Sequence, residues 1–157
     1  MSFSSLPATL TPALGGREAV ADALYRFAVG LDTNDKALFE SAFVTDAVFV
    51  LDGTVMDGLD AINTNCFGSI SKLDTTHFLT NQRINISDEN SKAELTCSAL
   101  AQHYRGGESK KVDATSLLVG SSYRAHLVKT TEDGLWKMKR LELKIVWSQG
   151  DWGVFSN

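Results

Sequence analysis

The chain has 157 residues, of which 43% are hydrophobic and 22% are charged, and its net charge at pH 7 is −4. This length suits one domain with its own core, and the acidic balance excludes a broad basic surface for nucleic acid or an anionic membrane. No apolar run approaches the roughly 20 residues of a membrane-spanning helix, so we expect a soluble, cytoplasmic protein.

The first third of the chain predicts an arm followed by two helices. Residues 1–14 mix Ser, Thr, Pro and Ala without a continuous apolar stretch, which indicates a flexible arm before a single domain over residues 15–157. From Arg17 to Gly30 the apolar residues recur at steps of three and four, as in an amphipathic helix. Residues 36–43 predict a second, short helix capped by a preceding polar residue.

Asp32 lies where the first of these helices ends. It follows Tyr25 by seven residues and Val29 by three, so the three side chains fall along one helical stripe. A carboxylate at this end meets the negative pole of the helix dipole, a mild cost that invites an explanation. The alternatives are a solvated aspartate and a cap for the second helix.

The rest of the chain predicts one short strand, a third helix and four long strands. These elements cover residues 47–51, 59–71, 74–86, 92–105, 114–129 and 135–147. The four long strands form an antiparallel meander, with a hairpin turn at residues 132–134. This order predicts an α+β fold in which the helices pack on one face of a strongly bent sheet. The space inside such a sheet is the natural binding site.

Two histidines lie on neighbouring predicted strands. Strand alternation puts His77, Leu79 and Asn81 on one face of the first. His103 ends a face of the next strand whose other members, between residues 93 and 101, are mostly small and leave room for a ligand. Most lone histidines are structural, so a buried His77 and a His103 at a cavity rim are the alternatives to functional roles.

Asp32, His77 and His103 could meet, since they come from a helix end and two strands able to pair. A carboxylate beside an imidazole fixes its tautomer and stabilises its protonated form, which makes histidine an effective base. The three histidines lack the spacing of a metal motif, so we expect no metal. Cys66 and Cys97 are expected to be free buried thiols, the alternative being one disulfide.

Four motifs in this order resemble the SnoaL-like, scytalone dehydratase-like branch of the nuclear-transport-factor-2-like superfamily. The resemblance covers residues 17–152. The motifs are Gly30-Leu31-Asp32-Thr33-Asn34-Asp35, Thr75-Thr76-His77-Phe78-Leu79, Gln102-His103-Tyr104 and Asp133-Gly134-Leu135-Trp136-Lys137.

The resemblance implies a cone-shaped α+β barrel whose curved, mostly antiparallel sheet encloses an apolar cavity. It also implies a homodimer or homotrimer without metal or organic cofactor. Asp32 and His77 match the family's catalytic pair, and His103 matches the second histidine of scytalone dehydratase. Ser122 and Arg124 match two substrate-holding positions if the last hairpin carries one extra residue.

The chain departs from the family dehydratase where that enzyme has two tyrosines, because Leu31 and Leu51 stand in their place. We therefore expect a more apolar pocket, lined by Leu51 and Asn81, in which Tyr25 supplies a lost hydroxyl. Arg124 would add a cation able to bind a carbonyl, an enolate or a carboxylate.

The resemblance implies a cofactor-independent lyase of dehydratase type, or an isomerase or cyclase. Its substrate would be a small apolar cyclic metabolite of secondary metabolism, and His77 with Asp32 would perform general acid–base chemistry. One alternative is a cyclase or pericyclase that acts by shaping its substrate. The other is a non-enzymatic role, in ligand binding or protein association, because a fold does not fix a function.

Overall fold

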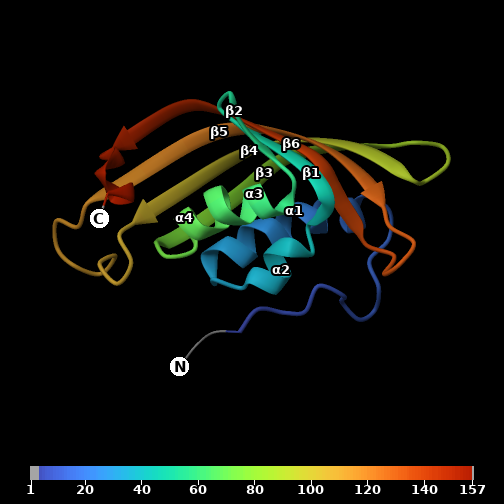
Figure 1. The fold of residues 1–157 in the computed structure, drawn as a ribbon, viewed down its shortest axis with the longest axis horizontal. Coiled ribbons are helices and arrows are strands. Elements are labelled where there is room, and N and C mark those ends of the chain that lie inside the picture. Colours follow the sequence, from blue (N-terminus) through green and yellow to red (C-terminus); the bar gives the residue numbers. More distant parts are fainter. Residues whose placement is uncertain (1–3, 157) are drawn as a thin grey trace.

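The computed structural model describes residues 4–156 and contains six strands around a set of short and long helices (Figure 1). The helical elements are α1 (Gly16–Asp32), α2 (Lys36–Glu40), α3 (Leu59–Ile62), the π-helical turn η1 (Asn63–Phe67), α4 (Gly68–Ile70) and the 3₁₀ turn η2 (Trp152–Phe155). The strands are β1 (Phe43–Leu51), β2 (Thr54–Asp57), β3 (Asp74–Ile86), β4 (Lys92–Tyr104), β5 (Ser116–Lys129) and β6 (Trp136–Gly150).

One curved sheet has the strand order β2-β1-β6-β5-β4-β3. The antiparallel meander from β3 to β6 is confirmed, and β1 joins its far edge by pairing in parallel with β6. The sheet arches over α1, α3 and α4, which all lie on its concave side (Figure 1). This arrangement confirms the predicted α+β class, with helices against a strongly curved, mostly antiparallel sheet.

The helical boundaries and the first hairpin differ from the prediction. The second helix ends at Glu40, since Phe43 already belongs to β1. β2 was not predicted, because its four residues lack a clear hydrophobic pattern. Asp52 and Gly53 form the two-residue loop before it, with φ of 46° and 92°. Two positive φ angles match the twist of a tight β-hairpin, so the turn sets the β1–β2 register.

An aromatic cluster fixes α1 against the sheet. The Phe27 ring lies 5.6 Å from that of Phe39 and 5.9 Å from that of Phe43, measured between centroids. It also meets Phe49 and Tyr123 edge-on, at 6.0 Å and 6.5 Å. Edge-on contacts of this kind are favourable for aromatic rings and direct the ring orientation. The cluster thereby joins α1 to α2, β1 and β5.

The segment before α1 lies against that helix. The Ser5 hydroxyl donates a hydrogen bond of 2.7 Å to Asp35 Oδ2. Leu6, Pro7 and Leu10 border a shallow pocket together with Tyr25 on the outer side of α1. The predicted flexibility of residues 1–14 stays a prediction, and residues 1–3 lie outside the described part. No helix within residues 4–156 is long and apolar enough to cross a membrane.

Gly30 allows α2 to pack close to α1, which gives a stability prediction. A Cβ at Gly30 would lie 2.6 Å from the Phe39 backbone nitrogen. We expect Gly30→Ala to lower the free energy of unfolding by about 1–3 kcal/mol, because overpacking against backbone outweighs the gain in helix propensity. Gly15→Ala is the matched control, since nothing lies within 4 Å of its Cβ position. Urea denaturation of both variants tests this, and equal midpoints would contradict it.

Candidate active site

Asp32 and His77 form a hydrogen-bonded pair at the inner face of the sheet. Asp32 Oδ1 lies 2.6 Å from His77 Nδ1, and Asp32 Oδ2 accepts a 2.9 Å hydrogen bond from the His77 backbone N–H. The Thr75 hydroxyl donates a further bond of 2.7 Å to Asp32 Oδ1. The His77 side chain is 6% exposed and that of Asp32 is 18% exposed. The carboxylate is therefore fixed by three donors from one strand.

The local sequence explains why the carboxylate reaches β3. Asp32 is the last residue of α1, and the helix ends with the Thr33 and Asp35 N–H groups bonded to the carbonyls of Val29 and Gly30. A carboxylate beside these carbonyls meets the negative end of the helix dipole. The donors from Thr75 and His77 offset that repulsion. The position of Asp32 therefore stabilises the contact with β3 and does not stabilise the helix.

His103 lies next to His77, and its tautomer follows from its own partner. Its Nδ1 is 3.1 Å from the Leu117 carbonyl oxygen, which only accepts hydrogen bonds, so Nδ1 carries the proton. The two imidazole rings meet edge-on with centroids 5.8 Å apart. Burial lowers the pKa of His103, and the nearby His77 lowers it further. His103 is therefore neutral at pH 7 and leaves Nε2 as an acceptor.

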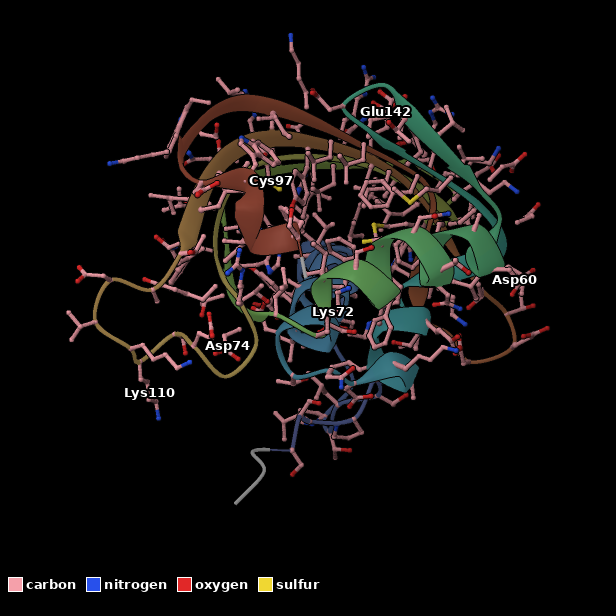
Figure 2. All side chains as sticks on the ribbon, turned by 60° about the vertical axis from the view of Figure 1, so that its left-hand side comes forward. Asp60, Lys72, Asp74, Cys97, Lys110 and Glu142 are labelled. Atoms are coloured by element: carbon pink, nitrogen blue, oxygen red, sulfur yellow. The ribbon has the colours of Figure 1, made fainter. Side chains whose placement is uncertain are left out.

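A cavity of about 110 Å³ lies beside the two imidazoles. Most of its wall is apolar and comes from α1, β1, β5 and β6, and Leu51 is part of this wall. The hydrogen-bonding side chains in the wall include His77, His103, Ser121 and Tyr123. Trp152 and Phe155 of η2 close one side, where the C-terminal turn folds beneath the sheet (Figure 2).

The sequence profile described as a SnoaL-like domain matches residues 12–142. The chain belongs to the SnoaL-like family. A curated relative, Terrestric acid biosynthesis cluster protein E of Penicillium crustosum, is 56% identical over 155 residues, which is 99% of each chain.

Solved structures show the same fold at low sequence identity. A protein provisionally named scytalone dehydratase, from Novosphingobium aromaticivorans, is 22% identical with a TM-score of 0.72, over 86% of this chain and 87% of that chain. The hexachlorocyclohexane dehydrochlorinase LinA-type3 of Novosphingobium barchaimii is 20% identical with a TM-score of 0.67, over 88% and 91% of the two chains. At this identity the likeness concerns the fold.

Four predicted binding residues of this SnoaL-like domain do not reach the cavity. Tyr25 is 46% exposed and lies on the side of α1 that the N-terminal segment borders. Asn81 sits in a bulge of β3 with φ of 56°, and its amide donates to Ser98 on the outer face. The bulge reverses its expected orientation. Ser122 and Arg124 also lie on the outer face of the sheet, with Arg124 beside Glu94.

Ser121 and Tyr123 are polar residues of β5 that line the cavity, and the sequence interpretation missed them. They are one residue earlier than the predicted pair, and their side chains point inward with the buried Leu117, Val119, Ala125 and Leu127. That apolar alternation was present in the sequence. It places Ser121 and Tyr123 on the inner face of the sheet. The match of Ser122 and Arg124 to substrate-holding positions assumed one extra residue in the last hairpin, and this assumption pointed to the wrong face.

The loop between β4 and β5 is fastened beside the start of β3. Asp74 Oδ2 accepts hydrogen bonds from the backbone N–H groups of Gly107 and Ser109, at 3.0 Å and 3.2 Å. Figure 2 shows Asp74 at the base of this loop, with Lys110 at its tip. These bonds hold the strand end that carries Thr75 and His77.

Both cysteines are free and buried. Burial raises the pKa of each thiol to about 12, so neither is a thiolate nucleophile at neutral pH. Cys66 borders the cavity as a small apolar side chain. Within residues 4–156, no group of three or more His, Cys, Asp or Glu side chains is arranged to hold a metal ion.

The lowered pKa of His103 predicts a pH-dependent stability. An unfolded imidazole titrates near 6.5. Because the folded pKa is lower, the unfolded state binds the proton first, and the free energy of unfolding decreases as pH falls below about 6.5. The slope has an upper limit of about 1.4 kcal/mol per pH unit for one proton.

His103→Asn tests this effect, since an asparagine amide can still donate to the Leu117 carbonyl. We expect the variant to lose less stability than the wild type between pH 7 and 5 in urea titrations. His126→Gln is the control, because His126 is 40% exposed on the outer face, and its slope should equal that of the wild type. Identical slopes for all three proteins would contradict the assignment.

Proposed function

We propose that this SnoaL-like domain is a cofactor-independent lyase of dehydratase type, or an isomerase or cyclase, that acts on a small apolar cyclic metabolite. The observation that carries the proposal is the 2.6 Å contact between Asp32 Oδ1 and His77 Nδ1 beside an apolar cavity. A carboxylate at Nδ1 keeps the proton there and leaves the Nε2 lone pair free to act as a base.

The proposed reaction starts with proton removal next to a carbonyl group. His77 Nε2 takes the proton, the C–H electron pair forms a carbon–carbon double bond, and the carbonyl oxygen becomes an enolate. The positive imidazolium is stabilised by the Asp32 carboxylate. In a dehydration, His77 then gives the proton to a departing hydroxyl group, which leaves as water. In an isomerisation, the proton returns to another carbon atom.

His103 would orient the substrate in this scheme rather than act as an acid. Its Nδ1 proton is engaged by the Leu117 carbonyl, so its Nε2 has a lone pair and no proton to give. A substrate hydroxyl or N–H group can donate to that nitrogen. The proton that a departing hydroxyl group needs is therefore assigned to protonated His77 and not to His103.

The size of the cavity and the relative from Penicillium crustosum support a small biosynthetic substrate. A volume of about 110 Å³ lies below the 300–1,000 Å³ of usual ligand pockets. The relative, 56% identical, is named for the terrestric acid biosynthesis cluster. This name supports the proposal that the present chain also acts in secondary metabolism.

The experiment is deuterium uptake from D₂O into the α-carbons of cyclohexanone, followed by NMR. This exchange needs only a base beside a bound ketone, so it requires no knowledge of the natural substrate. The wild type should exchange the protons much faster than the same concentration of free imidazole. His126→Gln should match the wild type, because His126 lies outside the cavity. A wild-type rate no higher than that of imidazole would favour a cavity that acts by shape alone, or a ligand carrier.

A further inference from the structure

Tyr123 is a buried polar side chain that the proposed acid–base chemistry leaves unused. It is 4% exposed and lines the same cavity as His77. It lies on β5 in register with Cys97 of β4 and Leu143 of β6. Its ring meets Phe27 edge-on at 6.5 Å between centroids. A phenylalanine could make the same packing contacts, so packing alone does not account for the hydroxyl.

The Tyr123 hydroxyl has no hydrogen-bond partner among residues 4–156. Within residues 4–156, Asn63, Gln82 and Arg105 have side-chain nitrogen or oxygen atoms that are fully enclosed and lack a hydrogen-bond partner. The Tyr123 oxygen is not one of these fully enclosed atoms. The hydroxyl therefore keeps contact with the open cavity. A buried hydroxyl normally finds a partner, because leaving it unpaired is unfavourable. A molecule in the cavity can provide that partner.

The hydroxyl can act only as a neutral group at physiological pH. Burial raises the pKa of Tyr123, and the neighbouring Cys66, Cys97 and Asp32 raise it further. A neutral phenol beside apolar walls offers one strong donor.

The two ends of the cavity are therefore chemically different. The imidazoles of His77 and His103 turn lone pairs toward it, whereas Tyr123 offers an O–H group. Along β5, Val119 lies opposite Ala101, the strand neighbour of His77, and Tyr123 follows four residues later. Four residues of strand span about 13 Å, which a small ring and the tyrosine side chain can bridge.

We propose that Tyr123 donates a hydrogen bond to a carbonyl oxygen of the substrate and stabilises the enolate that forms when His77 removes the neighbouring proton. This assigns a ketone or a related cyclic carbonyl compound as the substrate class, and it rests on the proposed function. The proton moves from carbon to His77 Nε2, while the negative charge moves to the oxygen beside Tyr123 and disappears when the carbon is protonated again.

The test compares two probes that differ in one non-hydrogen atom. Cyclohexanone carries the oxygen that Tyr123 would bind, and methylenecyclohexane has a CH₂ group in its place. Titrations followed by NMR should show the wild type binding cyclohexanone at least fivefold more tightly. Tyr123→Phe should bind both probes equally and should also exchange cyclohexanone protons at least tenfold more slowly. A Tyr123→Phe protein that keeps the preference would overturn the proposal.

Control variants separate this proposal from the proposed function. Tyr25→Phe and Tyr104→Phe should keep the preference for the ketone. His77→Gln should lose proton exchange but keep the preference, because Tyr123 is intact. Exchange that survives in His77→Gln would contradict the catalytic pair and not the role of Tyr123. A wild type that binds both probes equally, or neither, would contradict the role of Tyr123.

A measurement on the wild type covers the case in which Tyr123→Phe does not fold. With ¹³C label at the tyrosine Cζ atoms, cyclohexanone should shift one of the three signals, and methylenecyclohexane should leave it unchanged. Tyr25→Phe and Tyr104→Phe identify the other two signals. A ketone that shifts none of them would overturn the proposal.

Discussion

Asp32→Asn is expected to slow cyclohexanone proton exchange by about 10²–10⁴-fold, the usual contribution of positioned acid–base catalysis. The neutral amide no longer stabilises the imidazolium that forms when His77 takes the proton. An amide NH₂ turned toward Nδ1 would also favour the wrong tautomer, with the proton on Nε2. The measurement is the initial rate of deuterium uptake at saturating ketone, with the folded fraction checked by circular dichroism.

Two comparisons make this expectation specific. Asp46→Asn removes a surface carboxylate that pairs with Lys139 and is 74% exposed, so its exchange rate should equal that of the wild type. The double variant Asp32→Asn with His77→Gln should be about as slow as His77→Gln alone, because residues that act as a unit are not additive. An Asp32→Asn rate within threefold of the wild type would rule out the pair as the base.

The positions of Asp32 and His77 could be anticipated from the sequence because both follow simple periodic rules, and the family resemblance implied that the two residues pair. Helical spacing placed Asp32 at the end of α1, and strand alternation placed His77 on the inner face. The inner face of β4, from Ala93 to His103, followed in the same way and is confirmed by its alternating burial. The third donor, Thr75, was not predicted, since its position depends on how β3 meets the end of α1.

The errors arose where the regular pattern is interrupted or where two faces look alike. Asn81 left the inner face because a bulge adds a residue to β3. Ser121 and Ser122 are identical in chemistry, and only the apolar neighbours of Ser121 reveal the inward one. Tyr25 shares a helical stripe with Asp32 but lies about 10 Å away along the axis, where the N-terminal segment borders it. Such a long-range neighbour has no local sequence signal.

Ala101→Leu is expected to block the cavity while leaving the catalytic pair intact. Ala101 lies directly opposite His77 on β4 and is 7% exposed in the cavity wall. Three added carbon atoms would occupy much of a space of about 110 Å³. We expect cyclohexanone exchange to fall roughly 100-fold, since a displaced substrate no longer meets the base. The free energy of unfolding should change by no more than about 1–3 kcal/mol.

Ala101→Leu and Asp32→Asn are expected to differ in their effect on the Nδ1 proton of His77. In Ala101→Leu the Nδ1 proton shared with Asp32 should keep its deshielded NMR signal, whereas Asp32→Asn should lose that signal. Ser98→Leu adds the same side chain on the outer face of β4, where Ser98 contacts Asn81, and should leave exchange unchanged. If Ala101→Leu exchanged ketone protons as fast as the wild type, the reaction would take place outside this cavity, and His77 would act on the substrate from another side.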